Sequence, residues 1–396
     1  MSDTSLLLSY DFPPHGGGIA RMMGELALRY PKDTLIVSTG RYPGGAESDA
    51  RLPQPVDRAP IHAKRLRTIN GLALWSWRAS GLVRRYAPGF AWCGNLKPAA
   101  YPARWLKARY GLPYGVVVYG TDLLLLDAKI RRSMLKRRTT RVLLGDAAVI
   151  VAISAWTAEL CQAVLGTLGL SADGRVRRVP LGTDPKHFRP GVDPRAVRQR
   201  FGLSDGPWLL TVARLEWHKG IDTVIKALPA LRAAHPGARY AVAGVGERRP
   251  HFERLVAELG LGDAVRFLGA VTDEELPALY NAADVYVGAS RLHDLMAEGF
   301  GISLVEASAC GLAVVGGRSG GVPDAVRDGE TGILVDPDDP AAVAAGIGRL
   351  LADGELRARF GAAGRRAVET YYNWDRVVAD LIRIDGEFRR PPPAAR

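Results

Sequence analysis

The sequence predicts an α/β protein made of two doubly wound domains, each with a parallel sheet. Short β-rich runs alternate with amphipathic helical patterns in both halves of the chain. A glycine run, Gly16–Gly18, separates the first predicted strand from the first predicted helix. The 396 residues are enough for two domains of ordinary size, each with its own hydrophobic core.

The first half opens with a βαβ pattern. We expect a buried strand over Leu6–Tyr10, ended by Pro13-Pro14 and the glycine run, and then a helix, because apolar residues recur at helical spacing from Ile19 to Tyr30. The next strand is Leu35–Val37, so the connection is a right-handed crossover between parallel strands. Further strands are predicted at Tyr114–Tyr119 and Ala147–Ile153.

The second half repeats the alternation more clearly. Its predicted strands are Trp208–Val212, Arg239–Ala243, Val265–Leu268, Val285–Gly288 and Ala313–Val315, with helices at Asp222–Ala234, Phe252–Leu259 and Ala341–Leu351. The acidic run Asp336–Asp339 directly precedes the last of these helices, so we interpret it as an N-cap and not as a metal site.

These patterns place the domain boundaries in a segment rich in Pro and Gly near residues 180–190. We expect an N-terminal domain over residues 1–183 and a C-terminal domain over 184–372. A helix over 373–390 is expected to pack back on the N-terminal domain, and the Pro-rich residues 391–396 are expected to form a disordered tail.

Composition excludes several classes of protein. With 47% hydrophobic and 24% charged residues, the chain is neither fibrous nor wholly disordered. The three cysteines Cys93, Cys161 and Cys310 are scattered, which argues against a disulfide framework or a thiolate metal site. The first ten residues have no basic leader, and no apolar run reaches the roughly 18 residues of a membrane span. We therefore expect a cytoplasmic protein.

The positive charge lies in one half. Residues 1–190 contain 28 Lys and Arg against 13 Asp and Glu, whereas residues 191–396 contain 25 against 28. The densest basic cluster is Arg131, Arg132, Lys136, Arg137, Arg138 and Arg141, interleaved with Met134 and Leu135, and Trp75, Trp77, Trp92 and Trp105 lie earlier in the same half. A basic amphipathic helix with aromatics is typical of a peripheral membrane surface, although a simply solvated helix has the same pattern. No nucleic-acid-binding motif accompanies the charge.

Two motifs in the second half carry candidate chemistry. Glu298 and Glu306 bracket a Gly-Phe-Gly segment at a predicted helix start, where backbone N–H groups can bind a phosphate or a sugar oxygen. Arg214 and Lys219 lie on the loop after a predicted strand, where α/β folds bind ligands, and suit a diphosphate. Taken alone, each motif is also compatible with a helix cap or a solvated loop.

Further segments follow in a characteristic order: Gly244–Gly246, Val265–Gly269, Leu279–Val285, Ala309–Gly311, Gly320–Pro323 and Asp328–Gly332. With the two motifs above, this order resembles retaining glycosyltransferases of the GT-B fold, of the family 4 (glycosyl transferases group 1) type. The resemblance covers most of residues 205–340 and thins in the first half to Pro13–Gly18 and Tyr119–Asp122. It implies two Rossmann-like domains facing a central cleft.

The resemblance implies roles for individual residues. Arg214 and Lys219 would clamp the diphosphate of a nucleotide-sugar donor, Glu298 would contact sugar hydroxyls near the reacting carbon, and Glu306 would hold the ribose hydroxyls. The remaining donor contacts would come from Gly17, Gly18, Arg266, Phe267, Leu268, Gly299, Phe300, Gly301 and Ile302. The leaving phosphate would take the acceptor's proton on the same face, so no metal and no other cofactor is required.

One position departs from the family pattern. Many members carry a histidine where this chain has Tyr119, in the segment Tyr119-Gly120-Thr121-Asp122. A tyrosine still offers one hydroxyl donor and acceptor. Tyr119 and Asp122 are therefore candidates for contact with the sugar or the acceptor, although Tyr119 could equally be the end of a buried strand.

The sequence thus predicts a hexosyltransferase acting from a nucleotide sugar on a polar or lipid-linked acceptor. The spacing from Ser290-Arg291 to Glu298 is similar to that of phosphatidylinositol mannosyltransferases, which favours GDP-mannose and peripheral association with the cytoplasmic face of a membrane. UDP-sugar donors remain open. A nucleotide-sugar epimerase or an inactive binding paralogue would also be compatible with this fold. A dehydrogenase is disfavoured, since the glycine run lacks the GxGxxG spacing.

Overall fold

The structure, a computed structural model, describes residues 4–390 apart from the side chain of Ile61. The chain divides into two compact units. Unit 1 contains the residues up to Val179 and those from Trp374 on, and unit 2 contains Pro180–Asn373. The chain thus passes between units at 179/180 and 373/374, close to the 183/184 and 372/373 positions expected from sequence. The expected tail, 391–396, lies outside the described residues.

Unit 1 is built on a seven-stranded parallel sheet in the order β3-β2-β1-β4-β5-β6-β7. The strands are β1 (Ser5–Leu8), β2 (Leu35–Arg41), β3 (Val56–His62), β4 (Phe90–Cys93), β5 (Tyr114–Val118), β6 (Val149–Ala152) and β7 (Val176–Arg178). Nearly every residue of β1, β4, β5 and β6 is buried, as expected for a sheet covered on both faces.

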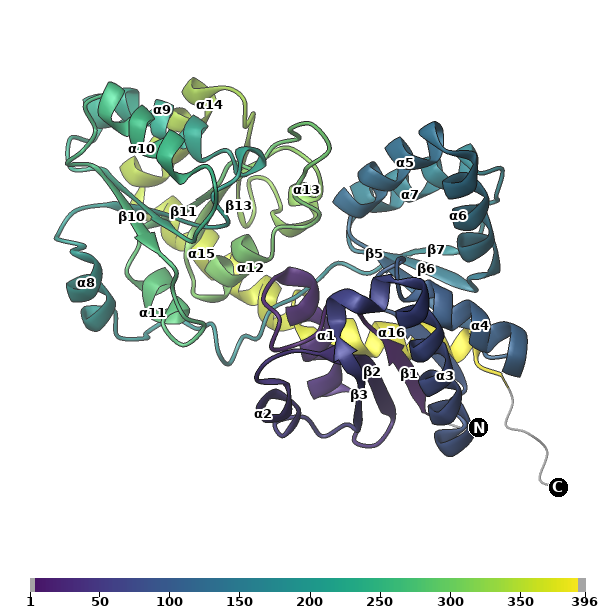
Figure 1. Cartoon of the computed structure of the whole chain (residues 1–396). Helices are drawn as coiled ribbons and strands as arrows, with labels where there is room; N and C mark the ends of the chain where they lie inside the picture. The colour runs from purple at the N-terminus through teal and green to yellow at the C-terminus, as the bar shows by residue number, and fades with distance from the viewer. Residues whose placement is uncertain (1–3, 391–396) are drawn as a thin grey trace. The chain divides into compact units, whose positions relative to one another are not determined.

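Helices cover both faces of this sheet (Figure 1). They are α1 (Gly18–Arg29), α2 (Gly45–Asp49), α3 (Ile69–Tyr86), α4 (Ala100–Tyr110), α5 (Thr121–Arg132), α6 (Met134–Asp146), α7 (Ala155–Thr167) and α16 (Trp374–Phe388), with a 3-10 turn η1 (Ala63–Arg67). Right-handed crossovers place α3 to α7 on one face and α1 on the other, where α16 packs against α1.

A buried carboxylate holds α16 to unit 1. Asp385 accepts hydrogen bonds from Ser5 Oγ at 2.7 Å and Trp92 Nε1 at 3.3 Å, and pairs with Arg389 at 2.8 Å. Ser5 lies on β1 and Trp92 on β4, near the centre of the sheet, so the last helix is an integral part of unit 1.

Unit 2 is built on a six-stranded parallel sheet in the order β10-β9-β8-β11-β12-β13. The strands are β8 (Trp208–Val212), β9 (Arg239–Ala243), β10 (Val265–Gly269), β11 (Val285–Gly288), β12 (Ala313–Gly317) and β13 (Gly332–Val335). The helices are α8 (Arg195–Phe201), α9 (Ile221–Ala234), α10 (Arg249–Glu258), α11 (Leu276–Asn281), α12 (Ile302–Ala309), α13 (Val322–Ala325), α14 (Pro340–Ala352) and α15 (Gly354–Thr370), with a 3-10 turn η2 (Trp217–Lys219).

The predicted fold class of two doubly wound parallel-sheet domains is confirmed. Asp339 is the N-cap of α14 and accepts the Ala341 N–H at 2.8 Å, as predicted for the acidic run. The single basic helix predicted around residues 131–141 is wrong. Ser133 has an extended backbone that ends α5, and its hydroxyl accepts the Lys136 N–H to begin α6.

The topology determines where ligands can be bound. In each sheet the strand order reverses at one point, between β1 and β4 in unit 1 and between β8 and β11 in unit 2. Loops at the carboxyl ends of the strands beside such a point diverge and leave a crevice. The predicted motifs follow β5 in unit 1, and β8 and β11 in unit 2.

Candidate functional site

Lys219 and Glu298 meet at the carboxyl edge of the unit 2 sheet. Lys219 ends η2, after β8, and Glu298 lies on the loop after β11, the strand next to β8. Lys219 Nζ lies 2.5 Å from Glu298 Oε2, with 16% and 20% of the two side chains exposed. The sequence placed these residues 79 positions apart, and the fold joins them in a half-buried ion pair that solvent still reaches.

The surroundings determine the charge state of this pair. Burial raises the pKa of Glu298, but the charge and hydrogen bond of Lys219, together with the Phe300 N–H, bring it below the ordinary value. Burial, together with the charge of Lys219, lowers the pKa of His218 to about 4. At neutral pH, Glu298 is therefore an acceptor of hydrogen bonds, and His218 is uncharged.

Two glycines allow the loops around the pair to pack closely. Gly220 has φ +65°, and a Cβ there would lie 1.8 Å from the carbonyl oxygen of Ala289, at the end of β11. Gly320, with φ +56°, would place a Cβ 2.4 Å from the carbonyl oxygen of Glu298. That carbonyl also accepts the Gly321 N–H at 2.9 Å. The loops after β8, β11 and β12, which we call the unit 2 loop cluster, thus pack backbone to backbone.

Helix α12 begins at Ile302, a few residues after Glu298. Its N-cap is Gly301, with φ +102° and no side-chain cap, and the preceding Phe300 is buried. The positive end of this helix, with the Gly299–Ile302 backbone, can bind an anion or a sugar oxygen. The structure therefore brings Gly299, Phe300, Gly301 and Ile302 to the same edge as Lys219 and Glu298.

Glu306 lies one turn further into α12 and is 3% exposed. Its carboxylate accepts a hydrogen bond from Tyr280 Oη at 2.8 Å. Burial raises the pKa of Tyr286, and the charges of Glu306 and Glu298 both add to this effect. Unlike Glu298, Glu306 reaches the surface only marginally.

The other predicted donor residues fall into two groups. Arg214 is exposed on the loop after β8, and among residues 4–390 no hydrogen bond or ion pair engages its guanidinium. Arg266 instead turns toward the start of β10, where it donates to the carbonyl of Gly262 at 3.0 Å, while Phe267 and Leu268 are half-buried further along the strand. The structure does not bring the Arg266 side chain to the unit 2 loop cluster.

In unit 1, Tyr119 and Asp122 lie at the carboxyl end of β5. Tyr119 Oη donates to the carbonyl of Gly94 at 2.7 Å, and its N–H donates to Asp122 Oδ1 at 2.9 Å. Burial and the charge of Asp122 raise the pKa of Tyr119, so the phenol keeps its proton. Burial raises the pKa of Asp122 to about 6. Gly17, before α1, has φ +115° and open space where a Cβ would lie, and Gly18 begins the helix.

Two polar residues near Tyr119, Asn95 and Asp11, were not predicted from the sequence. Asn95 Nδ2 donates to Asp11 Oδ2 at 3.0 Å, while Asn95 Oδ1 is buried without a hydrogen-bond partner. Both residues follow short buried strands, β1 and β4, at the point where the strand order reverses. A polar residue directly after a buried strand is the signal that could have identified them.

Lys97 has an unusual electrostatic environment. Its ammonium donates to Thr140 Oγ1 on α6 at 2.8 Å. Lys136 lies one turn before Thr140 on the same face of α6. Burial, followed by the charges of Lys136 and Lys129, lowers the pKa of Lys97 to about 8. In the described part of the chain, no carboxylate forms an ion pair with any of these three lysines.

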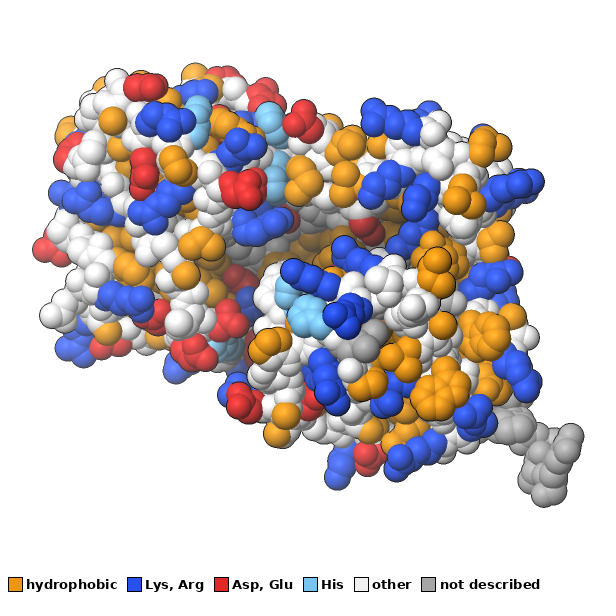
Figure 2. Space-filling model, in the orientation of Figure 1, with side chains coloured by type: hydrophobic (Ala, Val, Ile, Leu, Met, Phe, Trp, Pro, Cys, Tyr) orange, Lys and Arg blue, Asp and Glu red, His pale blue; other side chains and the backbone are white. Residues whose placement is uncertain are grey.

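The face formed by α3 to α6 is basic and partly apolar (Figure 2). Trp77, Trp105, Met134 and Leu135 are exposed on it. Trp105 Nε1 donates to Ser80 Oγ at 3.2 Å, one helical turn from Trp77. The sequence grouped Trp75 and Trp92 with this surface, and the structure corrects that grouping because both rings are buried in the core.

Two further features of residues 4–390 concern membranes and metal ions. No helix among them is both long and apolar enough to cross a bilayer. Within the same residues, no group of three or more His, Cys, Asp or Glu side chains is placed to hold a metal ion.

Comparisons with known proteins identify the family of the chain. Residues 195–367 match the family model for glycosyl transferases group 1. The chain is 31% identical to the GDP-mannose-dependent alpha-(1-6)-phosphatidylinositol monomannoside mannosyltransferase of Mycolicibacterium smegmatis, over 96% of this chain and 97% of the relative. It is 38% identical to the D-inositol 3-phosphate glycosyltransferase of Acidothermus cellulolyticus, over 62% of this chain and 55% of the relative.

Solved structures share the fold. The Anabaena protein HepE, crystallised with UDP and glucose, has a TM-score of 0.76 at 20% identity, covering 96% of this chain and 98% of that one. Sucrose-phosphate synthase from Thermosynechococcus elongatus has a TM-score of 0.74 at 22% identity, covering 97% and 98%. With the two parallel sheets, these likenesses show the GT-B fold. The family model matches residues 195–367, and the Mycolicibacterium smegmatis relative matches nearly the whole chain. The chain therefore belongs to the glycosyl transferases group 1 family and is a glycosyltransferase.

Proposed function

We propose that the protein transfers a mannosyl group from GDP-mannose to a phosphorylated, lipid-linked polyol, with retention of configuration and without a metal ion. The observation that carries the proposal is the Lys219–Glu298 pair beside the start of α12. Two relatives that match nearly the whole chain, from Mycolicibacterium smegmatis and Mycobacterium tuberculosis, are named GDP-mannose-dependent phosphatidylinositol monomannoside mannosyltransferases, which favours GDP-mannose over UDP-sugars.

Unit 2 supplies the groups that the donor needs. The exposed Arg214 and the half-buried Lys219 provide positive charge for the diphosphate, and the start of α12 adds backbone N–H groups. Glu298, ionised at neutral pH, can accept hydrogen bonds from sugar hydroxyls. Glu306, which is 3% exposed, would hold the ribose hydroxyls.

The proposed reaction needs no covalent intermediate. The bond between the anomeric carbon and the diphosphate oxygen breaks, and the electron pair stays on the diphosphate. The acceptor hydroxyl oxygen forms the new bond on the same face, and its proton moves to the leaving phosphate. Fixed cations and helix dipoles stabilise the charge that develops on the diphosphate, and they are in place before the reaction begins. Donor and acceptor together account for every atom and electron.

We predict that Glu298→Gln and Lys219→Ala each lower kcat by about 100-fold, because each removes one preorganised charge at the reacting centre. Lys219→Ala should also raise the KM for GDP-mannose. The measurement is release of GDP with and without acceptor.

Arg232→Ala is the matched control for these variants. It removes an ion pair of unit 2, Arg232–Asp263 at 2.7 Å, that lies near the amino ends of the strands, and it should leave kcat unchanged. Unchanged rates in both site variants would rule out the proposed donor site.

The lysine group in unit 1 supports a phosphorylated acceptor. Burial and then the charges of Lys136 and Lys129 disfavour the charged form of Lys97, and in the described residues no carboxylate forms an ion pair with these lysines, so a bound anion would relieve an existing electrostatic cost. Asn95, two residues before Lys97, has a buried amide oxygen without a partner, which can accept a hydrogen bond from a hydroxyl group. Asp11 and Asp122 offer further acceptors for polyol hydroxyls at the same edge of the sheet.

We predict that Lys97→Ala and Lys136→Ala raise the KM for a phosphorylated acceptor by about 10-fold or more, the effect of losing one charge-assisted contact. Each variant is assayed with phosphatidylinositol, inositol phosphate and unphosphorylated inositol. The KM of the variants should differ from that of the wild type only for the two phosphorylated acceptors, and the KM for GDP-mannose should not change. Lys107→Ala, which removes an exposed lysine on α4, is the control, and equal KM values for all variants would refute the phosphate assignment.

The α3–α6 face supports docking on an anionic membrane. Tryptophans favour the interface between lipid headgroups and acyl chains, and each Lys or Arg near an anionic leaflet contributes ~1 kcal/mol. The exposed Trp77 and Trp105 lie on the same helical layer as the basic α5 and α6. A protein docked through this face would meet a lipid-linked acceptor at the membrane surface.

We predict that the wild type co-sediments with phosphatidylcholine vesicles only when they contain phosphatidylglycerol, and that salt weakens the binding. Trp77→Ser with Trp105→Ser should weaken it by about 10-fold, because two rings lose their interfacial contact. Leu259→Ser, at an exposed apolar position of unit 2, should have no effect. Co-sedimentation that ignores anionic lipid and salt would remove the membrane part of the proposal and leave the transferase activity unaffected.

A further inference from the structure

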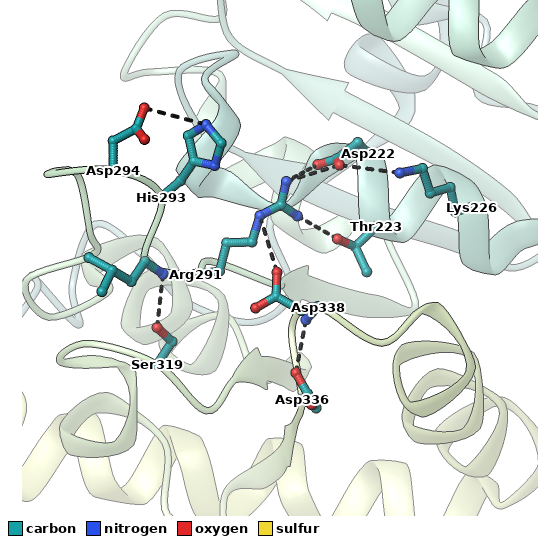
Figure 3. Close-up of polar contacts among 10 residues, drawn as sticks. Asp222, Thr223, Lys226, Arg291, His293, Asp294, Ser319, Asp336 and Asp338 are labelled. Atoms are coloured by element: carbon teal, nitrogen blue, oxygen red, sulfur yellow. Dashed lines mark hydrogen bonds and ion pairs between the residues drawn. The ribbon is translucent and has the colours of Figure 1, made fainter.

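Arg291, which follows β11 in unit 2, is 8% exposed although it carries a charge. Its guanidinium donates two hydrogen bonds to the Asp222 carboxylate, both at 2.9 Å, and one to Thr223 Oγ1 at 2.6 Å. Its Nε lies 3.5 Å from Asp338. Figure 3 shows the guanidinium between Asp222 and Thr223 on one side and Asp338 on the other.

These partners come from different loops. Asp222 and Thr223 lie in the first turn of α9, after β8, while Asp338 lies between β13 and α14. The backbone adds two links: Arg291 N–H donates to the carbonyl of His218 at 2.8 Å, and Leu292 N–H donates to Ser319 Oγ, after β12, at 3.1 Å. One two-residue segment therefore connects the loops that follow β8, β11, β12 and β13.

This segment lies close in sequence to both members of the proposed donor site. His218, whose carbonyl accepts the Arg291 N–H, directly precedes Lys219. Glu298 follows Arg291 on the same loop. Arg291 is therefore bonded to both loops whose side chains form the 2.5 Å contact between Lys219 and Glu298.

The guanidinium is not available to bind a ligand charge. Asp222 and Asp338 are both acidic, and every nitrogen of the guanidinium already has a partner. Lys226 adds a further pairing to Asp222 at 3.7 Å. The network thus contains its own counter-ions, in contrast to Arg214, which is exposed on the neighbouring loop.

We propose that Arg291 is a positioning residue of the donor site, which sets the geometry of Lys219 and Glu298 by joining the loops after β8 and β11. The inference rests on the proposed function. A side chain that positions reacting groups without touching them affects the transition state more than the binding of the donor, because small displacements of the reacting groups have large effects on rate.

The principal test is Arg291→Lys, which keeps the charge and loses the planar fork. We expect kcat to fall by about 100-fold, while the Kd for GDP changes by less than about 5-fold, since Arg214, Lys219 and the start of α12 remain. The matched control is Arg198→Lys. Arg198 donates to the carbonyl of Ala282 at 2.7 Å, just before β11 begins, so it supports the opposite end of the same strand. The control should retain the wild-type kcat.

A double variant separates positioning from stability. Removing only Arg291 takes its short contacts away from the buried Asp222 carboxylate and leaves it Lys226 at 3.7 Å, which is destabilising, whereas an apolar pair can replace a buried ion pair at little cost. Asp222→Leu with Arg291→Met should therefore keep a melting temperature close to that of the wild type and still show the low kcat. Wild-type kcat in this folded variant, or in Arg291→Lys, would overturn the proposal.

A structural readout keeps the result separate from the proposed function. Failure of the wild type to turn over GDP-mannose would count against the proposed function. The positioning role of Arg291 would then be tested by the distance between Lys219 and Glu298 in crystals. In crystals of Arg291→Lys, we expect the distance from Lys219 Nζ to Glu298 Oε2 to exceed the ion-pair limit of about 4 Å. An unchanged contact in those crystals would overturn the positioning role.

Discussion

The ion pair between Lys219 and Glu298 is the contact on which the proposed chemistry depends. It exists because β8 and β11 are neighbours at the point where the strand order of the unit 2 sheet reverses, so that two loops distant in sequence end beside each other. Lys219 keeps Glu298 ionised despite its burial. A carboxylate and an ammonium held in this way offer a nucleotide sugar one partner for its hydroxyls and one for its diphosphate.

The two units differ in how their positively charged side chains are paired. In unit 2, cations near the site are mostly paired, as Arg291 is by Asp222 and Asp338, so the loops have a defined shape before a ligand arrives. In unit 1, burial and the charges of Lys136 and Lys129 lower the pKa of Lys97, and in the described residues no carboxylate forms an ion pair with these lysines. The excess of 28 basic over 13 acidic residues in the first half of the chain is the sequence counterpart of this difference. The proposed donor site in unit 2 and the proposed acceptor surface in unit 1 would suit a transferase that acts on a charged acceptor.

Much of the fold could be predicted from the sequence because strands and helices depend on local patterns of residues. The β8, β9 and β11 boundaries were predicted without error, since each is a short apolar run between clear breakers. The Arg291 network could not be predicted in this way, because Asp222 lies 69 positions earlier and nothing local indicates the pairing. Burial of Trp75 and Trp92 was also missed, since a tryptophan in a basic half of the chain is compatible with either a core or a surface. The strand β4 has only four residues, too few for a period to be recognised.

We propose that unit 2 holds a nucleotide-sugar donor through fixed cations and backbone dipoles. The most direct test is the melting temperature of the full chain, with EDTA present, in saturating GDP-mannose, UDP-glucose or ADP-glucose. We expect GDP-mannose to raise the melting temperature most, by about 5 °C or more, since a ligand bound only to the folded state stabilises it by mass action. We also expect Lys219→Ala to abolish the shift. No shift with any of the three nucleotide sugars, or an equal shift in Lys219→Ala, would contradict the proposal.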